Sequence, residues 1–301
     1  HINDDKPAVF CKTAGLYILY PAPKNRRHMQ HPLTVLYTPL PQGSTAELVA
    51  WRCAFETALE PWLDARQWKH VNRFGRAAWQ QDASIADAEN CGPTPCGPTP
   101  CGQDVVEAAL SRLLARALLV TAAARHHRGG PLPQTGMDTR GRPLLSGWQA
   151  AFSHSGRAAF CALTPAVAAA SATLGLDAEA LTSAPPDASA FSQREYSALL
   201  TLHQQYRGRE SLRRWTVKEA MLKAAGLGLG MQPAQIPTGR SGQRAGLWRG
   251  PLGLLCWRTL ACPGHWLCVA QAGHVPTAQI FLQRQNPPTL LRRLAALRPQ
   301  P

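Results

Sequence analysis

The sequence has no apolar run of the roughly 18–20 residues that a membrane-spanning helix needs. Its most apolar windows, around residues 108–124 and 158–174, are interrupted by Arg, Ser, Thr or Pro. The first residues, His1-Ile-Asn-Asp-Asp, are acidic and contain no basic region ahead of an apolar core, so they do not indicate a signal peptide. We therefore predict a cytoplasmic protein with no membrane segment.

Acidic residues are scarce, since 18 Asp and Glu stand against 32 Lys and Arg, and the formal net charge is +14. Such a chain attracts anions, for example nucleic acid, phosphorylated small molecules or acidic proteins. Aromatic residues make up only 7% of the chain, the arginines are scattered, and no pattern for stacking bases is present. A basic nucleic-acid-binding protein stays open as an alternative, although charge alone does not favour it.

The nine cysteines include no Cys-x-x-Cys pair and no histidine partner at zinc-finger spacing. Three of them recur every five residues in Cys91-Gly-Pro-Thr-Pro-Cys96-Gly-Pro-Thr-Pro-Cys101. By composition, we predict that residues 82–103 are a disordered, duplicated insertion. Cysteines that lie among apolar residues are predicted to be buried thiols outside any disulfide: Cys161, Cys256 and Cys268.

The composition is that of a globular protein, since 45% of the residues are hydrophobic. The length of 301 residues suits one large domain or two small ones. Helical and strand patterns alternate. Helices are predicted at 46–63, 104–125 and 191–200, the last with Ser192 and Glu195 as a capping box. Strands are predicted at 33–38, 158–163, 246–248, 252–257 and 266–270. Residues 286–301 are interpreted as a polar, basic tail.

The stretch from Trp215 to Gly228 predicts a helix, because it is rich in good helix formers and the glycines supply the stop. Trp215, Glu219 and Lys223 follow at four-residue spacing and share one side. On its own, the Glu219 and Lys223 pair would be a surface ion pair worth about 0.3–0.5 kcal/mol.

Two other stretches carry groups that could complement this helix. If Gly175-Leu-Asp177-Ala-Glu179 is extended, Asp177 and Glu179 project side by side, and such close carboxylates favour a bound cation. A solvated strand end is the alternative interpretation. Ser153-His154-Ser155-Gly156-Arg157 precedes a buried strand and could bind an anion, although a lone histidine is more often structural. A Ser–His–acid hydrolase fits poorly, since no Gly-x-Ser-x-Gly elbow is present.

These stretches, taken in order, resemble the 4'-phosphopantetheinyl transferases of the Sfp type, within the holo-carrier-protein synthase superfamily. The resemblance runs from about residue 67 to 235. Its motifs are Gly141-Arg142-Pro143, Ser153-His154-Ser155, Gly175-x-Asp177-x-Glu179, Phe191-Ser-x-x-Glu195-Tyr and Trp215-Thr-x-Lys218-Glu219-Ala-x-x-Lys223. Two positions depart from the family pattern: Ala151 stands where an Asn is usual, and Glu107 stands where a basic residue is frequent.

The resemblance implies an α+β fold of two similar subdomains related by a pseudo-twofold, with the active site in the cleft between them. The halves would meet near residues 164–172. The expected division is an extension or linker at 1–30, an N-terminal subdomain at 31–165, a C-terminal subdomain at 166–285 and the tail. The implied reaction transfers the phosphopantetheine arm of coenzyme A to a serine of an apo carrier protein and releases adenosine 3',5'-bisphosphate.

The resemblance also implies roles for individual residues. Mg²⁺ would be held by Asp177, Glu179 and Glu219, with Glu219 accepting the serine proton. Lys223 would act in catalysis and face the phosphates, assisted by Lys218. The remaining phosphate contacts would come from Arg142, Ser153, His154 and, more weakly, Arg73 and Lys69.

The expected partners are coenzyme A and an acidic carrier protein of fatty-acid, polyketide or nonribosomal peptide biosynthesis. The positive charge of the chain would speed encounter with both. Internal duplication removes the need for a dimer, so a monomer is expected. An inactive relative that acts only as an interaction protein is a further alternative.

Overall fold

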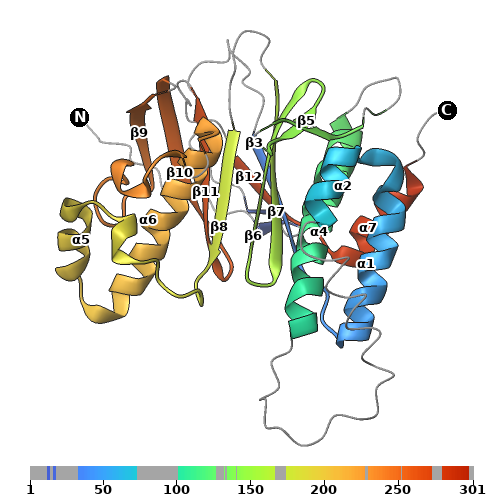
Figure 1. Cartoon of the computed structure of the whole chain (residues 1–301), viewed down its shortest axis with the longest axis horizontal. Coiled ribbons are helices and arrows are strands. Elements are labelled where there is room, and N and C mark those ends of the chain that lie inside the picture. The colour runs from blue at the N-terminus through green and yellow to red at the C-terminus, as the bar shows by residue number, and fades with distance from the viewer. Residues whose placement is uncertain are drawn as a thin grey trace, which may run out of the picture.

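The computed structural model describes residues 12–13, 16–17, 33–72, 101–126, 132, 134–139, 141–166, 174–227, 230–251, 253–272 and 280–297. These residues form two β-sheets and several helices, a mixed helix-and-sheet architecture that agrees with the predicted α+β class (Figure 1). Some predictions fall outside the described residues: Arg73, nearly all of the 82–103 insertion and most of the expected junction at 164–172.

The larger sheet has eight strands in the order β1-β2-β12-β3-β7-β6-β5-β4. All neighbouring strands run antiparallel except β12 and β3, which are parallel. The strands are β1 (Lys12–Thr13), β2 (Leu16–Tyr17), β3 (Leu33–Pro39), β4 (Gly136–Met137), β5 (Pro143–Leu145), β6 (Trp148–Ser155), β7 (Ala158–Pro165) and β12 (Ile280–Arg284). The predicted strands at 33–38 and 158–163 are therefore confirmed as β3 and β7.

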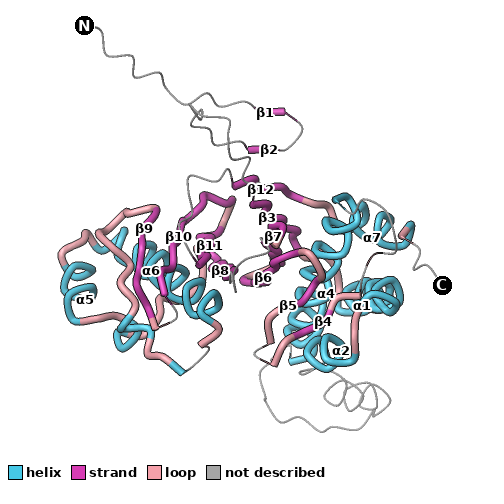
Figure 2. Tube along the Cα trace, turned by 90° about the horizontal axis from the view of Figure 1, so that it is seen from above, coloured by secondary structure: helices cyan, strands magenta, loops and turns pink. Residues whose placement is uncertain are grey.

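The smaller sheet has four antiparallel strands in the order β8-β11-β10-β9. They are β8 (Leu174–Ala180), β9 (Ala245–Gly250), β10 (Gly253–Cys262) and β11 (His265–Ala272). Seen from above, the two sheets lie side by side, and β8 and β6 face each other at the centre of the molecule (Figure 2). An apolar cluster joins the sheets there, with Phe160 and Ala162 of β7 next to Leu176 and Ala178 of β8.

Helix α4 (Cys101–His126) is the centre of the first core. Leu110, Leu113, Leu114 and Ala117 are all fully buried, as the apolar periodicity of the stretch predicts. The helix packs against β7, α1 (Thr45–Leu59) and α7 (Pro287–Ala296). A short helix, α2 (Ala65–Val71), follows the 3-10 turn η1 (Glu60–Trp62). No helix in the described part of the chain is long and apolar enough to cross a bilayer.

Helix α6 (Gln204–Ala225) covers the smaller sheet and forms the second core with it. It ends at Gly226, whose φ of 63° lies in the left-handed region, where glycine is favoured. The preceding helix α5 (Gln193–Leu200) begins with the predicted capping box of Ser192 and Glu195. The 3-10 turns η3 (Ala188–Ala190) and η5 (Pro233–Gln235) lie on either side of this helix pair in the sequence.

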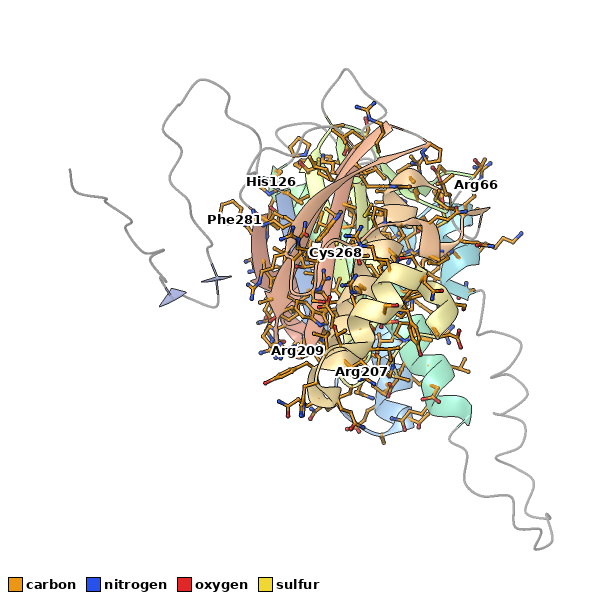
Figure 3. The ribbon with its side chains drawn as sticks, turned by 90° about the vertical axis from the view of Figure 1, so that its left-hand side faces the viewer. Arg66, His126, Arg207, Arg209, Cys268 and Phe281 are labelled. Atoms are coloured by element: carbon orange, nitrogen blue, oxygen red, sulfur yellow. The ribbon has the colours of Figure 1, made fainter. Side chains whose placement is uncertain are left out.

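The predicted cysteine environments are confirmed for all three apolar positions. Cys161, Cys256 and Cys268 are buried, and none of them forms a disulfide bond. Cys268 lies on β11 and is labelled in Figure 3. These thiols therefore act as small core side chains.

The C-terminal division predicted from the sequence is wrong. Strand β12 pairs with β3 in the larger sheet, so the smaller-sheet part does not extend to residue 285. Beyond it, α7 occupies most of the supposed tail at 286–301, and Leu290 and Leu294 are fully buried against the α4 core. Their four-residue spacing makes an apolar face that the neighbouring arginines obscure in the sequence.

Candidate functional site

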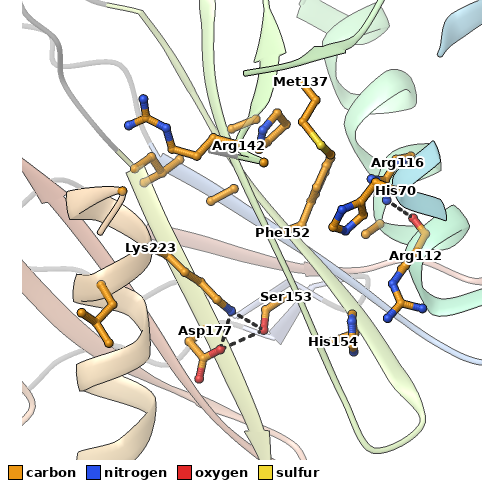
Figure 4. A pocket seen from close by; sticks show the side chains of 18 residues that line it. His70, Arg112, Arg116, Met137, Arg142, Phe152, Ser153, His154, Asp177 and Lys223 are labelled. Atoms are coloured by element: carbon orange, nitrogen blue, oxygen red, sulfur yellow. Dashed lines mark hydrogen bonds and ion pairs between the residues drawn. The ribbon is translucent and has the colours of Figure 1, made fainter. Parts of the chain in front are cut away.

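A cleft of about 330 Å³ lies between the two parts of the molecule. One wall comes from β8 and α6, with Asp177 and Lys223; the opposite wall comes from α4 and α2, with Arg112, Arg116 and His70 (Figure 4). Strand β6 forms the base between the walls. The structure thus brings together Lys223 and His154, which the sequence predicted to line one cleft.

Close contact between β8 and α6 depends on Gly175. A Cβ atom at this position would lie 2.0 Å from the carbonyl oxygen of Ala220 and 2.5 Å from the backbone nitrogen of Ala224. Glycine therefore lets the helix pack directly on the strand. Because residues two apart on a strand share a face, Asp177 and Glu179 also point toward α6, as predicted.

Asp177 is almost completely buried at the base of the cleft. Its Oδ1 accepts hydrogen bonds from Lys223 Nζ at 2.6 Å and from Ser153 Oγ at 3.1 Å. Its Oδ2 is buried without a hydrogen-bond partner. Burial raises the pKa of this carboxyl group, while the positive charge and hydrogen bond of Lys223 oppose the rise. One acceptor oxygen is therefore left unsatisfied in the middle of the site.

Glu179 lies two residues further along the same strand. Its Oε2 accepts a hydrogen bond from Ser155 Oγ at 2.9 Å, and its Oε1 accepts one from Trp215 Nε1 at 3.2 Å. Burial raises the pKa of Glu179, and the negative charge of Asp177 raises it further. The charge of Asp177 thus acts on Glu179 along the same face of β8.

Glu219 is half-buried on α6, one turn before Lys223. Its pKa is raised by burial first and then by the charges of Asp177 and Glu179, whereas Lys223 lowers it. Negative charge is therefore concentrated here and only partly neutralised by Lys223. Within the described ranges, no three His, Cys, Asp or Glu side chains converge closely enough to coordinate one ion as they stand.

The opposite wall holds a buried cation. Arg116 is only 2% exposed, and its Nε donates to Gln67 Oε1 at 2.6 Å while Nη1 donates to the Arg112 carbonyl at 2.9 Å. Its Nη2 is buried with no partner, and its guanidinium stacks over Phe152 at 5.3 Å. Burial, followed by repulsion from Arg112, lowers the pKa of Arg116 to about 9. One donor of a cleft-lining arginine is therefore buried without an acceptor, which costs free energy until a partner is supplied.

His154 points to the other side of β6 from Ser153 and Ser155, because side chains alternate along a strand. It shares that side with Phe152 and lies on the same wall as the arginines. Desolvation, followed by repulsion from Arg112 and Lys223, lowers the pKa of His154 to about 4. The ring is open to solvent through the cleft, so an entering phosphate can reach it.

Replacing His154 by asparagine should make folding less sensitive to acid between pH 6.5 and pH 4. The unfolded histidine takes up a proton near 6.5, whereas the folded pKa is lowered to about 4. In this window the unfolded chain binds more protons, so the free energy of unfolding falls as the pH falls. Urea unfolding across the pH range measures the effect, and identical pH profiles for variant and parent would contradict it.

The other predicted phosphate contacts lie in different places. Arg142 lines the cleft and is held by Asp138 at 2.7 Å. Ser153 also lines it, but its hydroxyl is engaged with β8, accepting from Ala178 N at 3.1 Å. Lys69 is exposed on α2 and does not line the cleft.

Lys218 does not belong to the site, so its predicted phosphate contact is corrected. The side chain is fully buried, and Nζ donates to Glu195 at 2.7 Å and to the carbonyls of Pro233 and Ile236 at 2.9 and 2.7 Å. Adjacent residues on a helix point about 100° apart, so Lys218 faces away from the side that carries Glu219 and Lys223. Its ammonium ties α6 to α5 and the loop that follows.

Sequence reasoning missed two arginines of the cleft, Arg112 and Arg116. The signal for the arginines was their four-residue spacing inside an otherwise apolar helix, which places both on one face. Glu107, the acidic departure from the family pattern, forms an ion pair with Arg157. The acid is therefore neutralised outside the cleft, and arginines further along α4 supply the positive charge.

Comparison with known families adds one finding. Residues 173–270 match the sequence model of the 4'-phosphopantetheinyl transferase superfamily. The matched segment contains Asp177, Glu179, Glu219 and Lys223, and ends before β12. A search of curated proteins found no match. The similarity therefore covers about a third of the chain, the part that includes the smaller sheet and α6.

Proposed function

We propose that this protein transfers the 4'-phosphopantetheine arm of coenzyme A to a serine of an apo carrier protein, releasing adenosine 3',5'-bisphosphate. The observation that carries the proposal is a single cleft with the Asp177 and Lys223 ion pair on one wall and, on the other, a buried arginine, Arg116, whose Nη2 has no partner. A nucleic-acid-binding surface would not line its cleft with Asp177 and have Glu179 and Glu219 close enough to feel its charge, because carboxylates repel a phosphate backbone. The superfamily match supports the same chemistry.

The oxygen donors of the carboxylates suit a divalent cation such as Mg²⁺, which would have to draw Asp177, Glu179 and Glu219 closer together than they stand. Asp177 Oδ2 is a buried oxygen without a partner. Besides burial, the charge of Asp177 raises the pKa of Glu179, and the charges of Asp177 and Glu179 raise the pKa of Glu219. A hard cation with oxygen ligands would relieve both conditions. Asp177, Glu179 and Glu219 would hold it, and the bound ion would neutralise charge on the pyrophosphate of coenzyme A.

The protein's own groups would divide the reaction between them. The serine oxygen of the carrier attacks the phosphorus that bears the pantetheine arm, and the bond from this phosphorus to the leaving nucleotide breaks. Glu219 accepts the serine proton, a role that its raised pKa suits. Lys223, whose ammonium now pairs with Asp177, would turn part of its charge to the departing phosphate.

The opposite wall would hold the nucleotide end of coenzyme A. Arg116 and Arg112, with His70 and His154, would bind the 3'-phosphate, while Arg142 would contact phosphates near the rim. The buried Nη2 of Arg116 would gain the acceptor that it lacks. This assignment gives the cleft two anion-binding ends, matching a substrate with a pyrophosphate and a separate phosphate.

The finer identity proposed is the Sfp type. Each part of the molecule places one long helix against its sheet, α4 on β7 and α6 on β8, and each contributes one wall of the cleft. We propose that the two parts are the related halves that the resemblance implies and that the monomer is sufficient for activity. An acidic carrier would be attracted by the charge of +14, so transfer should slow as salt increases.

The decisive experiment incubates the protein with coenzyme A, Mg²⁺ and apo carrier proteins from fatty-acid, polyketide and peptide synthesis. Mass spectrometry should show one added phosphopantetheine group, and a chelator should abolish the addition. 3'-Dephospho-coenzyme A should show a higher KM by roughly tenfold or more, because it leaves a charged donor unpaired. Absence of transfer to every carrier would overturn the proposed function.

A further inference from the structure

Strand β8 has one edge without a neighbouring strand in its sheet. It pairs with β11 on one side only, and its other edge faces β6 of the larger sheet. On this edge, Ala180 N donates to Ser155 Oγ at 2.9 Å and Ala178 N donates to Ser153 Oγ at 3.1 Å. Two serines of β6 therefore replace the missing strand partner and connect the two sheets across the base of the cleft.

The hydroxyl group determines which atoms donate and which accept in these hydrogen bonds. A serine hydroxyl has one hydrogen to donate, and the backbone N–H of Ala180 occupies an acceptor position on its oxygen. The hydrogen is consequently available for Glu179, whose Oε2 lies 2.9 Å from Ser155 Oγ. Ser153 repeats the arrangement with Asp177 Oδ1 at 3.1 Å. The same arrangement, a serine that accepts from a backbone N–H and donates to a carboxylate, thus occurs twice, two residues apart on both strands.

We propose that Ser155 is a positioning residue for Glu179, and this inference rests on the proposed function. Glu179 is held from two sides, by Ser155 on Oε2 and by Trp215 Nε1 on Oε1. The first donor comes from the larger sheet and the second from α6, so the carboxylate direction is set only when both parts are in place. Ser155 acts through Glu179 and makes no contact with the reacting atoms.

The position of Ser155 indicates that it orients Glu179 and is not needed to hold the two sheets together. Ser155 is half-buried at the end of β6, whereas the apolar contacts between the sheets are made by fully buried residues such as Phe160 and Leu176. Loss of one hydroxyl leaves that apolar contact intact. It releases Ala180 N–H and one oxygen of Glu179, which is next to Asp177 and repelled by it. The carboxylate is then free to rotate away from the ion that it would ligate.

The test is a matched pair of substitutions, Ser155→Thr and Ser155→Val, which have the same shape and differ in the hydroxyl group. In Ser155→Val the Ala180 amide should exchange with deuterium roughly tenfold faster, because one hydrogen bond is lost. Mn²⁺ binding, measured by calorimetry without coenzyme A, should weaken by roughly 10–100-fold, as for other residues that orient metal ligands. Ser155→Thr should restore both properties.

Steady-state transfer gives a further readout. In Ser155→Val, kcat should fall at a fixed low Mg²⁺ concentration and recover at high Mg²⁺. The KM for coenzyme A should stay within about twofold, because the opposite wall with Arg112 and Arg116 is unchanged. If the valine variant does not fold, Ser155→Ala removes the same hydroxyl without adding a methyl group. Unchanged Ala180 exchange or unchanged Mn²⁺ affinity in a folded variant would overturn the inference.

The two proposals fail in different ways. A parent protein that neither transfers phosphopantetheine nor binds Mn²⁺ would overturn the proposed function and, with it, any positioning of a metal ligand. A parent protein that binds Mn²⁺ and transfers the group, with Ser155→Val identical in affinity and kcat, would overturn only the role of Ser155. Equal losses of affinity in Ser155→Thr and Ser155→Val would also overturn it, because the hydroxyl would then be irrelevant.

Discussion

Replacement of Glu219 by glutamine should lower kcat for phosphopantetheine transfer by roughly 10²–10⁴-fold, the usual contribution of a positioned base. Glutamine keeps the shape of the side chain but cannot accept the serine proton, and it is a poorer ligand for a hard cation. The KM for coenzyme A should change much less, because the 3'-phosphate is held by the opposite wall. Single-turnover mass measurements with saturating coenzyme A give the rate directly.

The same variant should be at least as stable as the parent at pH 7. The pKa of Glu219 is raised by burial and by the charges of Asp177 and Glu179, which means that folding disfavours the ionised form. An uncharged side chain removes this cost, so thermal unfolding without coenzyme A should shift upward. A gain in stability combined with loss of activity is the pattern expected of a functional residue.

Glu210 on the same helix offers the opposite control. It is buried and paired with Arg213 at 2.7 Å, and it also lies 3.0 Å from Arg214 Nε. Glu210→Gln should therefore lower stability, because it leaves the buried Arg213 without its counter-charge, while transfer by the folded protein is kept. Full transfer by Glu219→Gln would remove Glu219 from the mechanism, and a fall in its melting temperature would contradict the electrostatic argument.

The parts of the fold that follow local rules could be predicted from the sequence. The apolar period of α4, the capping box of α5 and the glycine stop of α6 each depend on residues within a few positions of one another. Strand β8 and the shared face of Asp177 and Glu179 also follow from simple alternation. In these segments local preference and tertiary packing agree.

The missed features depend on residues far apart in the sequence. Strand β12 pairs with β3, which lies 247 residues earlier in the chain (Ile280 opposite Leu33), and α7 packs on α4. No local sequence pattern predicts the pairing of β12 with β3 or the contact of α7 with α4. In the site, the carboxylates could be read from spacing on one strand and one helix. The arginines of the opposite wall are harder to predict, because the four-residue spacing of Arg112 and Arg116 gains a meaning only when Gln67 and Phe152 are placed beside Arg116.

Lys218 illustrates the limit of motif transfer. It stands next to Glu219 in a motif that suggests a shared task, but helical geometry turns adjacent side chains in different directions. The structure buries its ammonium among Glu195 and two carbonyl oxygens. Ser155 shows the reverse case, since its importance arises only when β6 is brought against the edge of β8.

Replacement of Gly175 by alanine should be among the most destabilising single changes in the protein. The added Cβ would lie 2.0 Å from the Ala220 carbonyl oxygen and 2.5 Å from the Ala224 nitrogen, and both atoms belong to the backbone of α6. A helix backbone cannot move aside as a flexible side chain can, so α6 must separate from β8. We expect a loss of about 3 kcal/mol or more in the free energy of unfolding, at the upper end of overpacking effects.

Gly208→Ala is the matched control, because Gly208 lies on the same helix and an added Cβ there would meet only Pro185 Cγ, at 3.6 Å. Alanine is the better helix former, so this change should stabilise the protein by up to about 1 kcal/mol. Urea unfolding of both variants measures the contrast. Equal stability of Gly175→Ala and the parent would show that β8 and α6 are not packed as described.

Gly175→Ala should also impair the site in the molecules that remain folded. The strand carries Asp177 and Glu179, and the helix carries Glu219 and Lys223, so a wider spacing moves the two halves of the carboxylate set apart. The contact between Lys223 Nζ and Asp177 Oδ1, 2.6 Å in the parent, should be lost with it. Mn²⁺ affinity, measured at a temperature where the variant is folded, should therefore fall even though no ligand is replaced. Retained affinity in a destabilised variant would mean that the strand and helix separate elsewhere along their length, away from the carboxylates.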